Sequence, residues 1–319
     1  MVQQSGTRAT PRLELGDAFW EFFFNYQFLI GTRVMPIKKV GKREATFGAL
    51  TRASLTQRVN VKRNKNGTYN RTDIQAKDIS YACEEYGLEI PKDEVQKLEY
   101  MDDFDLDMAC AQIVAWILAV EQEIRVAAKI FDAATWTGTD LYKDYSSAPW
   151  DTASTDARAH VRFAKNKVRV NCGLEANTMV INNTQRDNLK ASDDVAEAIK
   201  YTSRMTEEEL NAALAAYFGV EKLLVGMGVY NSADEGQTFS GTEIWSDDYC
   251  WIGVTGGDND QVIAPSAGRI VLWEDDSPEN VTVDEYSEPN VRGDIIRARH
   301  QTDEKIIDPY FGFLLKVDA

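Results

Sequence analysis

Few side chains in this sequence could perform catalysis or bind a metal: two histidines, four cysteines and several acidic pairs. Neither His160 nor His300 has a histidine or cysteine three or four residues further on, so the spacing of a zinc site is missing. We interpret both as surface or structural residues. The spacing does not favour a catalytic Cys–His pair either. The cysteines form no CxxC pair, which indicates reduced, mostly buried thiols of a cytoplasmic protein; they are Cys83, Cys110, Cys172 and Cys250.

Paired carboxylates could serve a glycosidase, but such pairs are also common on turns, and we prefer that interpretation. The pairs are Asp193/Asp194, Asp247/Asp248 and Asp275/Asp276. The segment Gly256–Asp260 resembles the start of a calcium loop but lacks the later Gly and Glu. No GxSxG or GxxxxGK[ST] motif occurs, nor a GxGxxG after a strand. The sequence therefore predicts no catalytic residue, metal site or cofactor, and we expect a protein that is not an enzyme.

Charge is distributed unevenly along the chain. The net charge is −16, yet residues 1–80 carry +8, which leaves −24 for the remainder. Between Lys38 and Arg71 lie ten basic residues and one acid, Glu44. This basic stretch has no interleaved aromatic platform on which bases could stack, and the pI of the chain is about 4.7. Both facts disfavour nucleic-acid binding as the main activity.

The basic stretch is predicted to be a long hairpin, with strands at Thr46–Thr51 and Asp73–Tyr81 and a turn at Asn64–Thr68. It has little apolar surface to bury. Ten carboxylates follow between Glu84 and Asp107. Each charged run could serve solubility alone, but two adjacent runs of opposite sign favour a contact in which one copy's hairpin lies on the next copy's acids. The predicted contact residues are Arg52, Arg58, Lys62, Arg63, Lys65, Glu84, Glu85, Asp93, Glu94, Asp102 and Asp103.

Seven aromatic residues lie between Phe19 and Phe28. Two interpretations are equally open for them: a helix docked in its own core, or an arm across a neighbouring subunit. In the second case we expect intersubunit contacts from Phe22, Phe23 and Phe24. The apolar run Phe22–Ile30 is too short to span a bilayer, no signal peptide is visible, and we expect no membrane association.

A long helix at Asp105–Phe131 is predicted to hold these surfaces, because apolar residues recur every three or four positions. It would span roughly 40 Å. Its half between Met108 and Val120 is nearly all apolar, so we expect it to be covered on more than one side. Pro91 is predicted in the first turn of a short helix ending near Tyr100.

Residues 135–155 are predicted to form a loop, and a stretch of alternating helices and strands follows. The predicted helices are near Asp156–Val170, Thr184–Lys190, Val195–Tyr201 and Glu207–Tyr217, the last with a capping box at Thr206–Glu209 and a stop at Gly219. The predicted strands are Thr178–Ile181, Lys222–Tyr230, Tyr249–Val254 and Arg269–Trp273. The segments Val281–Tyr286 and Asp294–Lys316 alternate, and we expect them to return beside the long helix. The fold class is α+β.

Several motifs, in this order, carry a family resemblance. They are Val34–Gly41 (VMPIKKVG), Ile79–Glu89 (ISYACEEYGLE), Asn177–Asn182 (NTMVIN) and Ala216–Asn231 (AYFGVEKLLVGMGVYN), followed by Ile244-Trp245 and a strand with Trp251. From about Leu15 to Val317 the chain resembles the major capsid proteins of tailed bacteriophages, whose fold is shared with encapsulins and herpesvirus shell floors. The resemblance implies an N-terminal arm (1–34), an extended loop (35–83), a peripheral domain with a spine helix (84–155 and 278–319) and an axial α/β domain (156–277).

The function that the resemblance implies is a virion protein. It would self-assemble in the host cytoplasm into the hexamers and pentamers of an icosahedral shell that encloses double-stranded DNA without sequence-specific binding. The expected partners, besides other copies, are a separate scaffolding protein, a portal and decoration proteins. Many relatives begin with a cleaved scaffolding domain, for which there is no room before Leu13; the chain is then a processed form or uses a separate scaffold. The alternatives are an encapsulin-like compartment and an acidic cytoplasmic hydrolase.

Overall fold

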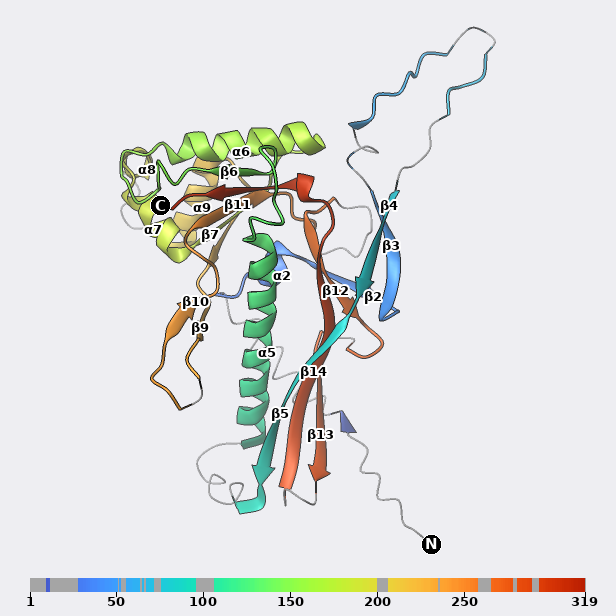
Figure 1. Cartoon of the computed structure of the whole chain (residues 1–319), viewed down its shortest axis with the longest axis vertical. Coiled ribbons are helices and arrows are strands. Elements are labelled where there is room, and N and C mark those ends of the chain that lie inside the picture. The colour runs from blue at the N-terminus through green and yellow to red at the C-terminus, as the bar shows by residue number, and fades with distance from the viewer. Residues whose placement is uncertain are drawn as a thin grey trace.

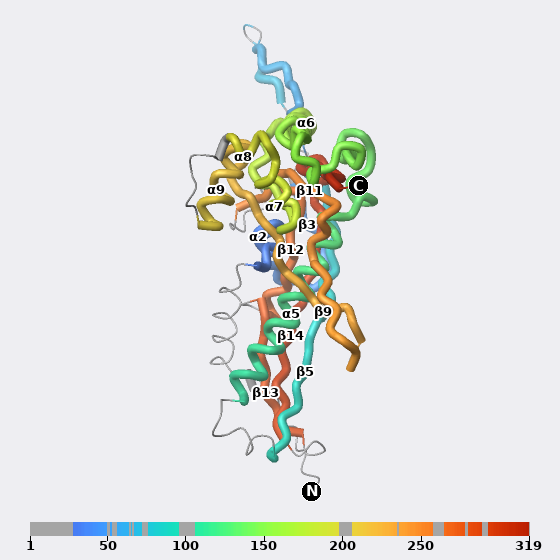
Figure 2. Tube along the Cα trace, turned by 90° about the vertical axis from the view of Figure 1, so that its left-hand side faces the viewer, coloured from blue at the N-terminus to red at the C-terminus, as the bar shows by residue number. Residues whose placement is uncertain are grey.

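The chain forms an elongated molecule around one long helix, α5 (Leu106–Ile130), which runs nearly parallel to the long axis (Figure 1). The structure is a computed structural model. It describes residues 10–11, 28–50, 52, 56–63, 65, 67–71, 76–95, 106–199, 206–234, 236–257, 265–277, 280–288 and 293–318. Figure 2 shows the same long, narrow shape from the side. Among the described helices, none combines the length and the apolar character needed to cross a bilayer.

A six-stranded sheet packs against α5 through β14 and β5. Its order is β1-β13-β14-β12-β2, and β5 also pairs with β14. The β5–β14 ladder is antiparallel and ten residues long. The strands are β1 (Thr10–Pro11), β2 (Ile37–Val40), β5 (Glu84–Asp93), β12 (Gly268–Trp273), β13 (Thr282–Glu288) and β14 (Gly293–Ile306). The expected return of the C-terminal strands beside the long helix is thus confirmed for β13 and β14.

A five-stranded sheet, in the order β6-β15-β11-β7-β8, lies at the other end with four helices around it (Figure 1). Its interior strand β7, between β11 and β8, is buried at every residue, as a strand covered on both faces must be. The strands are β6 (Tyr142–Asp144), β7 (Thr178–Asn182), β8 (Lys222–Gly226), β11 (Tyr249–Gly253) and β15 (Gly312–Lys316). The helices are α6 (Ala157–Cys172), α7 (Asn183–Ala191), α8 (Asp193–Ile199) and α9 (Glu207–Phe218).

Short elements complete the fold. The helix α2 (Gly31–Val34) precedes β2, and a 3₁₀ turn, η1 (Pro309–Phe311), precedes β15. Two separate hairpins are formed by β3 (Glu44–Leu50) with β4 (Ala76–Ala82), and by β9 (Val229–Asn231) with β10 (Gly241–Glu243). The sequence predicted the first hairpin, with strands at Thr46–Thr51 and Asp73–Tyr81; residues 73–75 of the second lie outside the described residues.

Local signals in the sequence correctly predicted both ends of α9. Thr206 and Glu209 form the capping box of α9, whose C-cap Gly219 has a φ of 66°, a left-handed conformation that glycine adopts without strain. The side chain of Asp156 caps α6 by accepting a hydrogen bond from the Ala159 amide at 2.8 Å. These caps satisfy backbone groups that the helices leave unpaired.

Three expectations were wrong. Pro91 lies in strand β5, where it pairs with Ile295, and not in the first turn of a helix. The loop predicted for residues 135–155 contains β6, which pairs with β15. That strand, β15, belongs to the five-stranded sheet and not to the surface beside α5. Sheet membership depends on partners far away in the chain, which local patterns do not reveal.

The apolar half of α5 was expected to be covered on more than one side. Among the described residues, part of it remains exposed. Val114 and Leu118 are buried against β13 and β14 side chains such as Val283. Ile113 and Ile117, one turn apart on another face, remain 52% and 40% exposed. Two large apolar side chains at adjacent positions on a helix surface favour an additional contact there.

The main core contains four tryptophans with almost no exposed surface: Trp136, Trp150, Trp245 and Trp251. Trp136 and Trp251 meet with ring centroids 5.9 Å apart. A Cβ atom at Gly312 would lie 2.6 Å from atoms of both rings, so the start of β15 approaches them as only glycine permits. Large aromatic surfaces of this kind dominate the energetics of a core.

One buried carboxylate joins α5 to two other parts of the chain. Glu123 is 3% exposed. Its Oε1 accepts hydrogen bonds from the Ile30 amide at 2.8 Å and from Trp245 Nε1 at 2.6 Å, and its Oε2 accepts one from the Gly31 amide at 2.6 Å. Burial raises the pKa of Glu123, while these hydrogen bonds and the charge of Arg33 act in the opposite direction.

A second polar cluster joins α5 to the six-stranded sheet. The guanidinium of Arg125 lies 3.7 Å above the centre of the Tyr86 ring and forms an ion pair with Glu304 at 3.2 Å. Its Nη2 also lies 3.2 Å from Nε2 of His300, which is 1% exposed. Burial and the adjacent Arg125 charge lower the pKa of His300 to about 3, so the imidazole is neutral and accepts this hydrogen bond.

We expect Glu123→Ala to lower the free energy of unfolding by about 3–5 kcal/mol, because three buried N–H groups lose their acceptor. Urea unfolding followed by circular dichroism measures this change. The control is Glu121→Ala on the same helix, where the glutamate is exposed and the change should be small. Equal unfolding midpoints for the two variants would contradict the role of Glu123.

We expect His300 to make the fold less stable in acid. The unfolded chain takes up a proton at His300 below a pH of about 6.5, whereas the native side chain does not until the pH nears 3. Stability is therefore lost as the pH falls, and from pH 7 to 5 this one group costs about 2 kcal/mol. His300→Gln keeps an acceptor for Arg125 but does not titrate. Between these two pH values, the free energy of unfolding measured in urea should fall by about 2 kcal/mol less in the variant than in the unsubstituted chain. An equal fall in both proteins would refute the role of His300.

Candidate functional site

The side chains that could perform chemistry have structural partners instead. His160 stacks on Tyr145 with ring centroids 3.7 Å apart, and its Nδ1 accepts a hydrogen bond from Trp150 Nε1 at 3.1 Å. Together with the buried His300, this confirms that the histidines are structural. From the acidic pairs, Asp276 forms an ion pair with Arg299. These groups bind other parts of the same chain, so they do not form an open catalytic centre.

The structure agrees with the interpretation of the cysteines as reduced, mostly buried thiols. All four are free and buried. Burial raises the pKa of each thiol, in the case of Cys83 to about 11 with help from Asp303. A thiol with a raised pKa is a poor nucleophile because little thiolate is present at neutral pH.

One acidic cluster is visible among the described residues. Asp247, Asp248 and Asp318 have carboxylate oxygens within 4.8 Å of one another, and all three side chains are half-buried. Asp248 also accepts a hydrogen bond from Ser246 Oγ at 2.9 Å. Clusters of exposed acids occur on many proteins without a bound ion, so the cluster alone does not define a metal site.

The most conspicuous surface feature is the basic loop, which we define as residues 51–75 between β3 and β4. Figure 1 shows its described part projecting away from the body of the molecule. Its contacts are largely local: Arg63 Nε donates to the Gly67 carbonyl at 2.7 Å, and Asn70 Nδ2 donates to the Asn60 carbonyl at 2.5 Å. Four predicted contact residues here are exposed: Arg58, Lys62, Arg63 and Lys65.

The fifth basic residue, Arg52, has a partner in its own chain. Its guanidinium lies 3.5 Å above the centre of the Tyr310 ring, which is a cation–π contact. Arg52 therefore fastens the base of the basic loop to the body, a role that the sequence did not reveal. Its contact with a neighbouring copy stays a prediction.

The basic loop also exposes apolar side chains that the charge pattern did not predict. Val61 is 89% exposed and Tyr69 is 72% exposed. The Tyr69 ring lies 4.8 Å from the guanidinium carbon of Arg63. A loop that presents both cations and apolar side chains is suited to a protein surface, where both can be buried.

The acidic residues that follow lie along strand β5. Glu84, Glu85 and Glu94 are exposed, as the predicted contact requires. Asp93 is half-buried, and its Oδ1 accepts a hydrogen bond from the Val95 amide at 2.8 Å. The remaining predicted contacts, Asp102, Asp103, Phe22, Phe23 and Phe24, lie outside the described residues.

Lys92 is part of this acidic segment but does not neutralise its surface. It is 1% exposed and pairs with Asp107 at 2.6 Å and Glu285 at 2.9 Å. Burial lowers the pKa of Lys92, but the hydrogen bonds and charges of the two carboxylates outweigh burial, so its pKa is raised. The sequence pattern could not show this, because charge counting treats every lysine as exposed.

The basic loop and the far end of β5 lie at opposite ends of the molecule (Figures 1 and 2). The two surfaces cannot meet within one chain in this structure. A contact between them needs a second copy, and it joins different surfaces of the two copies. Such a heterologous contact continues from copy to copy and forms rings or arrays.

Comparisons with known proteins identify the fold. No family model matches the chain. In sequence, the chain is 26% identical over 230 residues to the major capsid protein of Burkholderia phage BcepMu, with 70% of each protein covered. In structure, it is similar to a phage-related protein from Bordetella bronchiseptica RB50, with a TM-score of 0.73, 19% identity and coverage of 97% and 98%. It is also similar to a chain from the capsid of Cyanophage P-SCSP1u, with a TM-score of 0.56, 12% identity and coverage of 100% and 93%.

The fold is therefore that of phage capsid proteins, as the sequence motifs predicted. The sequence match to a phage major capsid protein and this fold together support a shell-forming role for the chain. They imply a structural and not an enzymatic protein, and they do not favour the cargo compartment or the hydrolase.

Proposed function

We propose that this chain is the major capsid protein of a tailed phage, which assembles into hexamers and pentamers of an icosahedral shell around double-stranded DNA. The observation that carries the proposal is the basic loop, which projects from the body with exposed cations and apolar side chains. The similarity to a phage major capsid protein supports it. Assembly in the host cytoplasm, a separate scaffolding protein, a portal and decoration proteins belong to the same proposal, and it includes no enzymatic activity.

The domain division of the proposal follows the arrangement of the two sheets. Residues 1–34 would be the arm and 35–83 the extended loop. Residues 84–155 and 278–319 would form the peripheral domain, and 156–277 the axial domain. Support comes from α5 packing on β5 and β14, and from the helices gathered around the five-stranded sheet. The C-terminal strand β15 lies in that second sheet, so it would link the two domains.

Contacts in the proposed shell are modest and numerous. Each exposed ion pair between a loop cation and a carboxylate on β5 contributes about 0–1 kcal/mol. Because every copy repeats the contact, these small terms add over the lattice. Exposed pairs are screened by salt over about 8–10 Å, so high ionic strength should weaken this part of the assembly energy.

Electron microscopy of the expressed protein tests the proposal directly. We expect closed shells or ring-shaped capsomers, formed either by the chain alone or with its neighbouring phage proteins. Nuclease-protected DNA in particles from infected cells would support a genome shell. A protein cargo in place of DNA, or a small discrete oligomer under all these conditions, would contradict the proposal.

We expect the triple reversal Lys62→Glu, Arg63→Glu and Lys65→Glu to block shell formation while the subunit stays folded. All three side chains are exposed on the loop, so the change should leave the core intact. Sedimentation and electron microscopy measure assembly, and circular dichroism reports folding.

The matched control for the loop reversal is Lys129→Glu, Lys143→Glu and Lys222→Glu. These residues are also exposed but lie elsewhere on the molecule, and the change in net charge is the same. The control should assemble. Normal shells from the loop variant, or equal loss from both variants, would refute the electrostatic role of the loop.

A further inference from the structure

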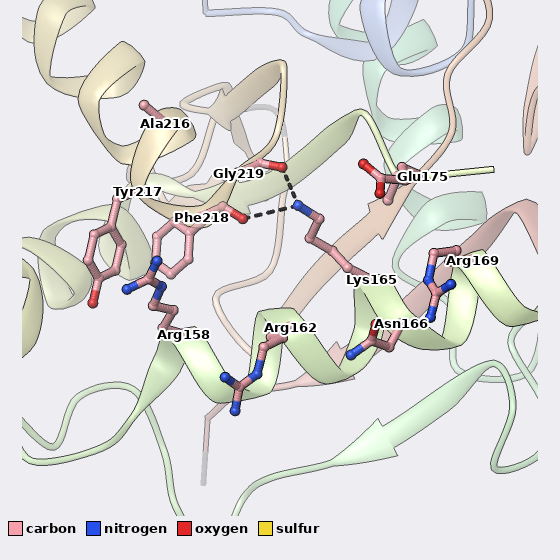
Figure 3. A pocket seen from close by; sticks show the side chains of 11 residues that line it. Arg158, Arg162, Lys165, Asn166, Arg169, Glu175, Ala216, Tyr217, Phe218 and Gly219 are labelled. Atoms are coloured by element: carbon pink, nitrogen blue, oxygen red, sulfur yellow. Dashed lines mark hydrogen bonds between the residues drawn. The ribbon is translucent and has the colours of Figure 1, made fainter.

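A groove between α6 and α9 gathers positive charge on an otherwise acidic protein. The groove encloses about 330 Å³ and is lined by Arg158, Arg162, Lys165 and Arg169 from α6 and by Tyr217 from α9 (Figure 3). The four cations lie at intervals of four, three and four residues, so they share one face of the helix. A neighbouring face of α6, with Val161, Ala164 and Val168, is buried in the core.

Two of these cations are held by α9. Lys165 Nζ donates hydrogen bonds to the carbonyls of Phe218 and Gly219, at the C-terminal end of that helix. The guanidinium carbon of Arg158 lies 4.8 Å from the centre of the Tyr217 ring. Arg162 and Arg169 are exposed, and neither forms an ion pair with any residue that the structure describes. The groove therefore presents the exposed cations Arg162 and Arg169 beside an aromatic ring, with one carboxylate, Glu175, in its lining.

A second projecting surface is the hairpin of β9 and β10, residues 229–243. Figure 1 shows it projecting from the body and pointing away from α6. This stretch contains three acids, Asp234, Glu235 and Glu243, and no basic residue. Phe239 is 71% exposed and Val229 is 45% exposed.

The hairpin is held in shape by its own hydrogen bonds. Asn231 Oδ1 accepts from the Ala233 amide at 3.2 Å and from the Ser240 amide at 2.9 Å. At the base, Glu243 Oε2 accepts from Asn182 Nδ2 at 2.6 Å. A finger that is already ordered loses little conformational entropy when it binds, which favours its use as a contact.

We propose that the acidic hairpin of one copy inserts into the basic groove of a second copy. The carboxylate of Asp234 would face Arg162 and Arg169, and Phe239 would lie against Tyr217 and the stem of Arg158. The two surfaces match in charge and in aromatic character, and one chain cannot bring its own hairpin to its own groove in this structure. The contact is heterologous and extends the shell-forming function proposed above, on which it rests.

A nucleic acid fits the groove less well. At about 330 Å³, the groove is near the lower limit for small-ligand pockets. Glu175 is part of its lining, and the adjoining cavity contains Asp194 and Glu197 beside Arg158 and Arg162. A duplex would bring a dense row of phosphates against these acids, whereas a hairpin tip brings a few spaced carboxylates.

Thiol cross-linking between two singly substituted chains tests the contact. One chain carries Asn166→Cys in the groove and the other carries Thr238→Cys on the hairpin; both residues are exposed, and neither change removes a charge. The native cysteines are buried and should stay unreactive. With a short bismaleimide we expect a heterodimer of the two chains, which are told apart by tags of different length. Lys222→Cys in place of Thr238→Cys is the control and should give only background.

Charge reversal in the groove gives the second readout. Arg162→Glu with Arg169→Glu in the Asn166→Cys chain should abolish the heterodimer, whereas Lys129→Glu with Lys143→Glu should leave it unchanged. Background cross-linking in particles that assemble normally would overturn this inference and leave the proposed function intact. If no variant assembled, and the unsubstituted chain did not assemble either, the proposed function would be contradicted. The presence or absence of the cross-linked heterodimer would still test the contact between hairpin and groove.

A nucleic-acid ligand is the remaining outcome. Loss of cross-linking together with binding of a short DNA duplex that the charge reversal abolishes would assign the groove to nucleic acid instead.

Discussion

The carboxylate of Glu123 is the interaction on which the shape of this molecule depends. It holds the amides of Ile30 and Gly31 against α5 from one side and the indole of Trp245 from the other. These groups come from the N-terminal part, the long helix and the loop before β11. Because a buried acceptor with three donors tolerates little displacement, the N-terminal segment, α5 and the five-stranded sheet keep fixed relative positions. The basic loop and the β9–β10 hairpin therefore project from a body of fixed geometry.

Buried charged side chains and exposed charged side chains have different partners. Inside, Lys92 lies between Asp107 and Glu285, and Arg125 lies between Glu304 and His300. Removing one member of such a group leaves a buried charge unpaired, which is costly. Outside, the cations of the basic loop are exposed, as are Glu84, Glu85 and Glu94, and the far end of β5 is separated from the loop by most of the molecule's length. The first set specifies one subunit, and the second set is available to other copies.

Much of this fold was predictable because its signals are local. The 25 residues of α5, the capping box at Thr206 and the left-handed stop at Gly219 follow from patterns within a few turns of chain. The placement of Pro91 in β5 and of β15 in the second sheet was not predictable, because partners distant in sequence decide it. The charged runs predicted the exposed loop, but not that Arg52 stacks on Tyr310 or that Lys92 is buried. Those outcomes depend on three-dimensional packing.

The near-continuous path from β4 into β5 has a mechanical consequence. Figure 1 shows the two strands following one line from the basic loop toward the opposite end of the molecule. Tension applied to the loop would act parallel to the ten-residue ladder between β5 and β14. In that direction the hydrogen bonds resist in shear and share the load, whereas a pull across the strands would open them one at a time. A pull on the loop from a neighbouring copy would therefore load this ladder in the direction in which it is strongest.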